Sequence, residues 1–341
     1  MNFVPDRTDD PIKLHIQPLG RIDPLAPQFG PDAKQSVPEG LVPYLFEGDA
    51  EGAAYLVLDG AHLKGGLQEL LANSGLAHAC LLSGKAQEEQ SLTAPWIVRL
   101  ERENRFTRDV FTHDPQKAAP WHLWRHAPGL LLRSPADLDT LRRHFRKFLR
   151  IADAEGKAYF LRFWECGPLL EYLRRADRPS EIARMWLRTA TGHPIELILP
   201  ISGYCYHCTA NGRESTGAPR GTLQLSDHDV SALYDGTLRA RASRILYRME
   251  RFNPDVFADL DREALIIQAI ATIKRMIGYR ITSGIELDRA VRLEVLLRMP
   301  LEAWDKSGRL LAILGSDLRE SRKMDLVEAH VDEVFAEPIG A

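Results

Sequence analysis

Residues 55–63 read YLVLDGAHL, and this stretch decides how the first half of the chain is expected to fold. The apolar run Tyr55–Leu58 ends on Asp59 and Gly60, and leucines at helical spacing follow from Leu63 onward. This order predicts a strand, a sharp turn and a helix. Because α/β enzymes often place functional groups where a strand ends, Asp59 is either a catalytic carboxylate or only the residue that begins a helix.

Further apolar runs follow along the chain as far as residue 163. The candidate strands are Tyr55–Leu58, His78–Leu82, Trp96–Leu100, Leu130–Leu132 and Ala158–Phe163. An amphipathic helix is expected over 134–151, with Ser134 as its N-cap. Strands that alternate with helices predict an α/β N-terminal lobe over residues 46–176, with a mainly parallel sheet and flanking helices.

The segments on either side of this lobe have different compositions. Residues 1–45 are rich in proline and glycine and are expected to form an N-terminal arm, with one short strand at Lys13–Ile16. Residues 177–225 form a connecting segment, in which 195–201 and 204–209 are expected to pair as a β-hairpin.

The remainder of the chain, residues 226–341, has only helical patterns, which predicts an all-α C-terminal lobe. One long helix is expected from Asp261 to about Ile281. Because its centre is apolar on nearly every side, we expect the lobe to bury this helix.

Composition limits the classes of function that need to be considered. The chain has 341 residues, 45% of them hydrophobic, which is enough for two packed domains, and its net charge is -3. A chain so close to neutral has no general attraction for nucleic acid or for an anionic membrane. The longest apolar run, Ala264–Ile273, is about half the length of a membrane span. The N-terminus has no signal-peptide core, and the four cysteines are too few for a disulfide framework, so a cytoplasmic, reduced protein is expected.

The residues that follow Asp59 lack the functional groups that usually accompany a catalytic aspartate. Gly60, Ala61 and His62 follow it, so neither a second carboxylate nor a phosphate-binding loop is present. We therefore favour a structural role, in which Asp59 caps a helix over 62–72 and Gly60 supplies the turn. The alternative is a hydrolase-type α/β enzyme that uses Asp59 with a histidine.

The most metal-like fragment is the run from Cys205 to Cys208, which includes His207. These three side chains could ligate zinc, but a structural zinc site usually has two such pairs, and the sequence has no second pair. In a strand, Cys205 and His207 would face one side and Cys208 the other. A zinc-stabilised regulatory module around Cys205 and Cys208 remains a second alternative.

Two groups of side chains are candidate anchors for a protein partner. The aromatic candidates are Trp121, Trp124 and Trp164. The basic candidates, at helical spacing, are Arg241, Arg244, Arg248 and Arg251. Tryptophan and arginine often dominate protein interfaces, although core packing and a solvated helix face are the common alternatives.

Several of these pieces, in this order, resemble one known family. YLVLDGAHL (55–63) resembles its opening Y-x-L-L-D-G-A signature, and APWIVRL (94–100) resembles its G-P-W-L-V segment. Residues 130–173 resemble its ending, a Ser-led helix followed by a strand that closes on Arg-Phe. The family is the type VI secretion effector chaperones, or adaptors, which contain domain of unknown function 4123, and the resemblance covers roughly 53–175.

The resemblance carries over onto particular residues of this chain. The matching positions are Tyr55, Asp59, Gly60, Pro95, Trp96, Arg162 and Phe163. Where the family tends to have R-F-Y-D-P, this chain reads RFWEC (162–166), and Ala94 replaces the glycine before Pro95. Arg162 is the candidate for an ion pair with Asp59, because each is expected to end a strand, and the hypothesis is that the two pair if these strands are parallel and adjacent.

The resemblance implies a non-catalytic protein–protein interaction scaffold. Such a protein binds a cognate toxic effector in the cytoplasm and loads it onto the VgrG spike of the secretion apparatus. It would need no cofactor and no metal, and neither nucleic acid nor a membrane would be among its partners.

Overall fold

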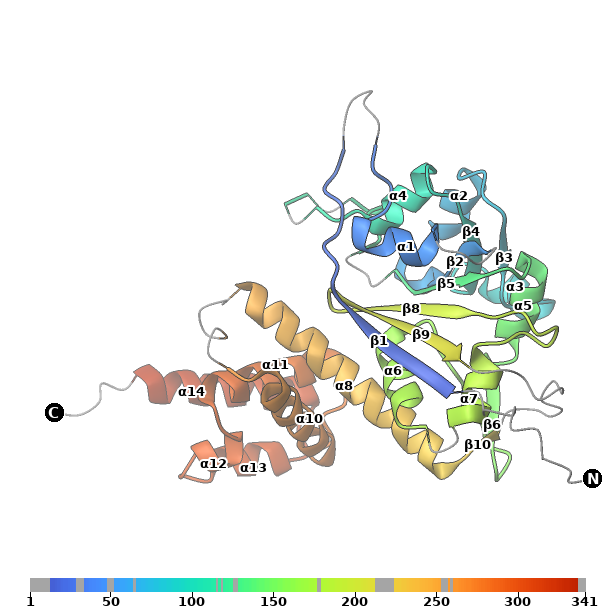
Figure 1. Ribbon diagram of the computed structural model, residues 1–341. Coiled ribbons are helices and arrows are strands. Elements are labelled where there is room, and N and C mark those ends of the chain that lie inside the picture. The colour runs from blue at the N-terminus through green and yellow to red at the C-terminus, as the bar shows by residue number, and fades with distance from the viewer. Residues whose placement is uncertain are drawn as a thin grey trace, which may run out of the picture. The chain divides into compact units, whose positions relative to one another are not determined.

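The computed structural model describes residues 13–28, 34–47, 52–63, 66–114, 116–117, 119–124, 128–176, 179–211, 224–252, 257 and 260–336. The chain divides into two compact units, Met1–Gly236 and Thr237–Ala341, and the division falls within helix α8 (Asp227–Phe252). The first unit mixes strands and helices and the second is helical, so these two parts of the predicted fold class are confirmed (Figure 1).

A seven-stranded sheet forms the centre of the first unit. Its order is β1 (Lys13–Arg21), β9 (Tyr204–Asn211), β8 (Glu196–Ile201), β5 (Leu130–Ser134), β2 (Ala53–Asp59), β4 (Pro95–Leu100) and β3 (His78–Cys80). Each neighbouring pair of strands runs antiparallel. The prediction of a mainly parallel sheet is therefore wrong.

The reason is that two strand–helix–strand units interleave. Helix α2 (Leu67–Ala72) connects β2 to β3, and helix α4 (Arg105–Phe111) lies between β4 and β5. Strands β2 and β3 both run antiparallel to β4, so they are parallel to each other, and β4 and β5 are parallel across β2 in the same way. The two strands of each strand–helix–strand motif are parallel to each other, as the pattern predicts. One strand of the other motif lies between them. The apolar residues of β2 and β5, buried on both faces, resemble those of a parallel sheet.

Helices cover both faces of this sheet (Figure 1). Helices α5 (Leu138–Arg146), α6 (Cys166–Arg174) and α7 (Pro179–Trp186) pack on the face that carries Tyr55 and Val57, which we call the α6 face. Helices α1 (Val42–Leu45), α2 and α4 pack on the face that carries Leu56 and Leu58, which we call the α2 face. The strand alternation therefore places Asp59 on the α6 face.

The connecting segment contributes its predicted hairpin to the main sheet. Strands β8 and β9 pair, and the turn between them has positive φ at Ser202 (49°) and Gly203 (85°), as a tight two-residue turn requires. Strand β1 extends beyond the predicted Lys13–Ile16 and pairs with β9 at the edge of the sheet.

The first unit also contains a second, smaller sheet. It has three strands, β10 (Gln224–Leu225), β6 (Arg150–Asp153) and β7 (Ala158–Phe160), with β10 parallel and β7 antiparallel to β6. The helix expected over 134–151 is the shorter α5, because Ser134 ends β5 and Asp137 is the N-cap, accepting from Thr140 N at 2.7 Å.

The second unit has its own apolar core. Its further helices are α10 (Arg262–Gly278), α11 (Gly284–Leu297), α12 (Leu301–Trp304), α13 (Arg309–Gly315) and α14 (Glu320–Ala336). Helix α10 buries Ile266, Ala269 and Ile273, but Ile267 is 59% exposed. The prediction that the lobe buries this helix on nearly every side is wrong, because one of its apolar sides stays open. Among the described helices, none combines the length and apolar character needed to cross a lipid bilayer.

Candidate functional site

Asp59 is the last residue of β2, and its carboxylate is almost fully enclosed. One oxygen, Oδ1, accepts a hydrogen bond from the backbone N–H of Ala61 at 2.9 Å. This bond begins the short 3-10 helix η2 (Gly60–Leu63), whereas α2 begins only after Gly66. Asp59 therefore begins a helical turn, as expected, but it does not cap the longer helix that the sequence predicted.

The other carboxylate oxygen of Asp59 binds Arg162. The Arg162 Nη2 atom lies 2.5 Å from Asp59 Oδ2, which confirms the expected ion pair. The expected route to this pair is wrong, because β7, the strand before Arg162, belongs to the smaller sheet and is not a neighbour of β2. Arg162 Nε also lies 2.6 Å from Glu165 Oε1, and the guanidinium sits 5.9 Å from the ring centre of Trp164. One arginine thus joins the end of β2 to the start of α6.

Gly60 is required because another segment comes close to it. Its N–H donates to the carbonyl oxygen of Ala94 at 3.0 Å. A Cβ atom at Gly60 would lie 2.7 Å from that oxygen and 2.9 Å from the carbonyl oxygen of Leu92. Pro95, which follows Ala94 in the chain, pairs with Asp59 in the β2–β4 register. The two family-like motifs, around 59–60 and 94–96, therefore form one contact, and close approach rather than a turn conformation explains the glycine.

Gly129 also belongs to this cluster, although no sequence motif predicted it. It has φ of +123°, and a Cβ atom there would overlap the carbonyl oxygen of Val57 on β2. The carbonyl oxygen of Gly129 accepts a hydrogen bond from the thiol of Cys166, whose Sγ atom lies 3.3 Å away at the start of α6. The signal that could have identified it is a glycine directly before the apolar strand that begins at Leu130.

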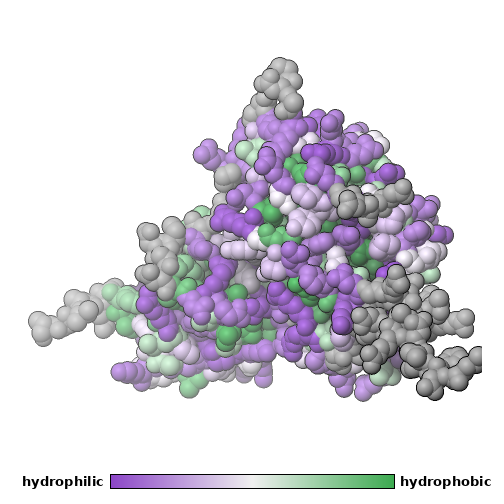
Figure 2. Space-filling view, in the orientation of Figure 1, coloured by the Kyte–Doolittle hydropathy of each residue, from purple (hydrophilic) through white to green (hydrophobic). Residues whose placement is uncertain are grey.

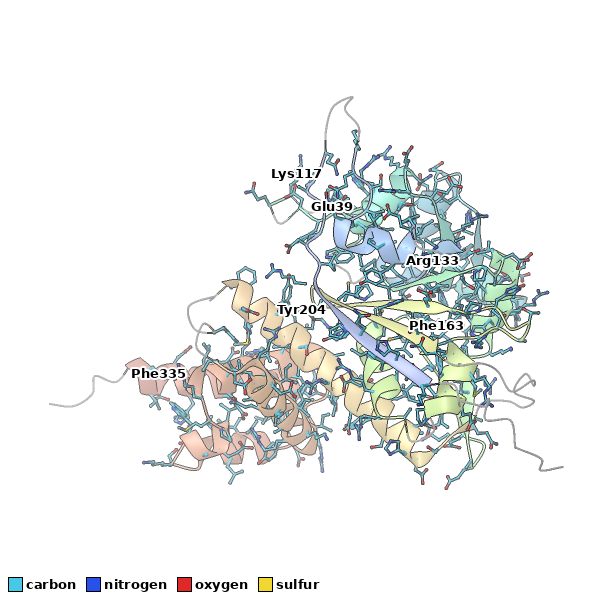
Figure 3. The ribbon with its side chains drawn as sticks, viewed as in Figure 1. Glu39, Lys117, Arg133, Phe163, Tyr204 and Phe335 are labelled. Atoms are coloured by element: carbon cyan, nitrogen blue, oxygen red, sulfur yellow. The ribbon has the colours of Figure 1, made fainter. Side chains whose placement is uncertain are left out.

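Tyr55 and Phe163 hold the layers of the α6 face together. The Tyr55 hydroxyl donates to the carbonyl oxygen of Ala136 at 2.8 Å, before α5 begins. Phe163, which is labelled in Figure 3, is buried. Its ring stacks on that of Phe145 with centres 5.4 Å apart, and the ring centre of Trp186 lies 5.8 Å away. Both positions of the family-like motif therefore pack inside the unit.

The three candidate tryptophan anchors differ in accessibility. Trp164 is only 4% exposed and packs against Phe163, so core packing describes it better than partner contact. Trp124 is half-buried and lies 5.7 Å from the ring of Phe111. Trp121 is 44% exposed and is the most accessible of the three.

The candidate arginines lie on α8, and intramolecular contacts occupy two of them. Arg241 donates to the carbonyl oxygen of Gly284 at 2.7 Å, and Arg248 forms an ion pair with Asp288 on α11. Arg244 is exposed. The side chain of Arg251 lies outside the described part of the structure.

The geometry of the cysteine fragment argues against one shared metal ion. Cys205 belongs to the core on the α2 face, whereas Cys208 belongs to the core on the α6 face. Burial raises the pKa of both thiols to about 12, so they stay protonated near neutral pH. His207 instead lies 2.9 Å from Glu196 Oε2. Within the described residues, no group of three or more His, Cys, Asp or Glu side chains is arranged to hold a metal ion.

The hydrolase alternative needs an Asp59 carboxylate that is free to react. Both of its oxygens are occupied, one by Ala61 N–H and the other by Arg162, and its side chain is 3% exposed. A catalytic carboxylate would have to reach a substrate in a cleft. The cluster around Asp59 is instead arranged to hold β2, the segment before β4 and the start of α6 in place.

Comparison with known proteins finds one family model that matches part of the chain. No curated protein and no solved structure matched the sequence. The cluster around Asp59 and Arg162, with Gly60, Pro95, Gly129 and Phe163, lies wholly within one matched segment. Residues 54–181 match the model of the family described as Domain of unknown function (DUF4123).

Proposed function

We propose that this protein is a type VI secretion effector chaperone, or adaptor, which binds a cognate toxic effector in the cytoplasm and loads it onto the VgrG spike. The observation that carries the proposal is the DUF4123 match over residues 54–181, because this domain is associated with such adaptors. The protein acts through its surfaces as an interaction scaffold and breaks no bonds in its partners.

The contacts around Asp59 support this proposal. The residues that resemble the family signature are engaged in internal contacts: Asp59 with Arg162, Gly60 with Ala94, and Tyr55 with Ala136. Such contacts make a rigid frame, which presents the surface around it in one shape. A preorganised surface loses less conformational freedom when it binds a partner.

The surface of the helical unit also supports it. Large apolar side chains are exposed there, including Ile267, Ile285, Leu296, Leu311 and Phe335. Figure 2 shows hydrophobic residues at the far end of α14, where Phe335 is 68% exposed and stacks on Trp304 with ring centres 5.8 Å apart (Figure 3). Exposed aromatic side chains such as Phe335 are enriched at protein interfaces.

The decisive experiment is capture of both partners. The full chain, tagged and purified from cells with an active type VI secretion system, should retain one effector and the VgrG protein. The pairwise complexes should then re-form from purified components. Retention of neither partner by a folded protein would contradict the proposal.

A pair of variants on α14 makes this experiment sharper. Phe335→Glu places a charge on an exposed aromatic position and should weaken the affinity for one partner by about tenfold. Asp332→Asn, at an exposed position on the same helix, is the control and should change affinity by less than about twofold. Equal affinities for the two variants would exclude the end of α14 from both interfaces.

A further inference from the structure

A hollow of about 500 Å³ opens on the α2 face, and neither Asp59 nor Arg162 lines it. Its walls come from α2 through Gln68, from β3 through His78, and from helix α3 (Lys85–Gln90) through Gln87 and Glu88. Trp96 on β4, together with Gly84 and Ser91, completes the lining. The hollow therefore combines aromatic rings, amide groups and one carboxylate in a single place.

The aromatic part of the hollow has a defined orientation. The Trp96 side chain is half-buried, and its Nε1–H donates to the carbonyl oxygen of Ser91 at 3.5 Å. The His78 ring lies 5.8 Å from Trp96, centre to centre, and its Nδ1 is 2.8 Å from the carbonyl oxygen of Leu76. A tryptophan held in this way offers a fixed, electron-rich ring face, which is the best aromatic partner for a cation.

The charge of the hollow favours a cation as well. Glu88 is the one carboxylate in the lining, and neither lysine nor arginine lines the hollow among the described residues. Within that part of the chain, Glu88 belongs to no ion pair, whereas the nearby Lys85 pairs with Glu89 at 3.4 Å. The amide oxygens of Gln68 and Gln87 can accept further N–H groups. A positive ligand would thus meet a carboxylate, two amide acceptors and an aromatic face.

We propose that this hollow binds an arginine side chain exposed on the cargo effector, a partner that rests on the proposed function. An arginine guanidinium is planar and has five N–H donors, so it can stack on Trp96 while it donates to Glu88 and to the two glutamine amides. A lysine ammonium has three donors and no planar face, so it fits less well. Trp96 is the tryptophan of the family-like segment 94–100, which gives this position a role beyond packing.

The first test uses a small probe and does not need the effector. N-acetyl-arginine methylamide is titrated into the full chain, and the indole N–H signal of Trp96 is followed by NMR, assigned through its loss in Trp96→Phe. A saturable shift with a dissociation constant on the order of millimolar is expected. The matched N-acetyl-citrulline methylamide, which lacks the charge, should bind at least about tenfold more weakly. An equal response to both probes, or none to arginine, overturns the proposal.

The chain offers a matched pair of variants for this test. Glu88→Gln removes the charge inside the hollow, whereas Glu89→Gln removes the same charge from the next residue, which does not line it. Glu88→Gln should weaken arginine binding by about fivefold, and Glu89→Gln by less than about twofold. Both side chains are exposed, so thermal unfolding should be unchanged, and this is measured alongside. Equal effects of the two variants overturn the proposal.

The second test applies the same variants to the effector complex. Glu88→Gln should weaken effector binding by about fivefold relative to Glu89→Gln. If both variants bind the effector equally well, the hollow does not hold the cargo, although the adaptor function stands. If the unaltered chain binds no effector, the adaptor function fails, and the arginine titration alone then decides whether the hollow is a cation site.

Discussion

The guanidinium of Arg162 and the carboxylate of Asp59, separated by 103 residues in sequence, meet with Nη2 and Oδ2 2.5 Å apart. The pair is unequal, because the Asp59 side chain is 3% exposed whereas the Arg162 side chain is 43% exposed. A carboxylate enclosed in this way depends on its partner for solvation. An arginine that still meets water depends on the carboxylate much less.

Loss of Arg162 should therefore destabilise the protein more than loss of the Asp59 charge. Arg162→Met leaves an enclosed carboxylate without its cation and should cost about 2–3 kcal/mol, at the low end of buried pairs because water reaches Arg162. Asp59→Asn should cost about 1–2 kcal/mol, since an amide oxygen can still accept from Ala61. Urea unfolding measures both values.

Two further variants check that the contact itself is responsible. The double variant Asp59→Asn with Arg162→Met should cost clearly less than the sum of the single changes, because the two side chains interact directly. Arg102→Met removes an exposed partner of Glu47 in the same unit and should cost less than about 1 kcal/mol. Strictly additive costs for the first pair would show that the contact contributes nothing.

Among the described glycines of the N-terminal unit, Gly129 should be the hardest to replace. In Gly129→Ala the new methyl group would overlap the carbonyl oxygen of Val57, at a backbone φ of +123°. We expect a loss of about 4 kcal/mol or more, seen as a low yield of folded protein and a large drop in unfolding temperature. Gly156→Ala is the control, because its φ of +81° is also positive but its surroundings are open, and it should cost about 1 kcal/mol. Similar costs for the two would refute the steric explanation.

His144 should make stability depend on acidity. The pKa of His144 is lowered to about 4, mainly by burial and also by the charge of Lys147, whereas the hydrogen bond to the carbonyl oxygen of Trp186 acts in the opposite direction. In the unfolded chain the same group titrates near 6.5. As the pH falls, His144 therefore takes up its proton in the unfolded state before it does so in the folded state. The stabilisation that neutral His144 gives the folded protein is fully present above pH 6.5 and is lost as the pH falls to about 4.

The size of this effect is measurable. The full loss from His144 is about 3–4 kcal/mol, given about 1.4 kcal/mol for each pH unit between the two pKa values. Urea unfolding across this pH range should give a steeper decline for the unaltered chain than for His144→Gln. Between about pH 7 and pH 8 the two stability curves should run parallel, because the unfolded histidine is then mostly neutral. Identical slopes at acid pH would contradict the assignment.

Arg244 is the cleanest test of the basic side of α8. It is exposed, whereas Arg248 already pairs with Asp288, so reversing Arg248 also places a carboxylate beside Asp288. Arg244→Glu should leave urea unfolding unchanged and weaken capture of either the effector or VgrG by about tenfold. Arg244→Lys keeps the charge and serves as the control. Undiminished capture of both partners by Arg244→Glu would remove this surface from the proposal.

Local features of the fold were predictable from the sequence. The strands β2, β4 and β5, the β8–β9 hairpin and the helical second half each follow from patterns among nearby residues. The Asp59–Arg162 pair was also predicted, from the expectation that each residue ends a strand, although the strand geometry behind that prediction was wrong. Periodicity and turn chemistry act over a few residues, so a single stretch contains all the information they need.

Other features depend on contacts that no single stretch contains. An apolar strand such as β2 indicates that both of its faces are covered, but it does not say that β4 and β5 run antiparallel on either side of it. The need for glycine at Gly129, the burial of Trp164 and the open side of α10 likewise arise from segments far away in the chain. The sequence by itself determined where most of the main strands and helices form, because those preferences are local. Only the tertiary structure decided strand order, direction and accessibility, because these result from packing between distant segments.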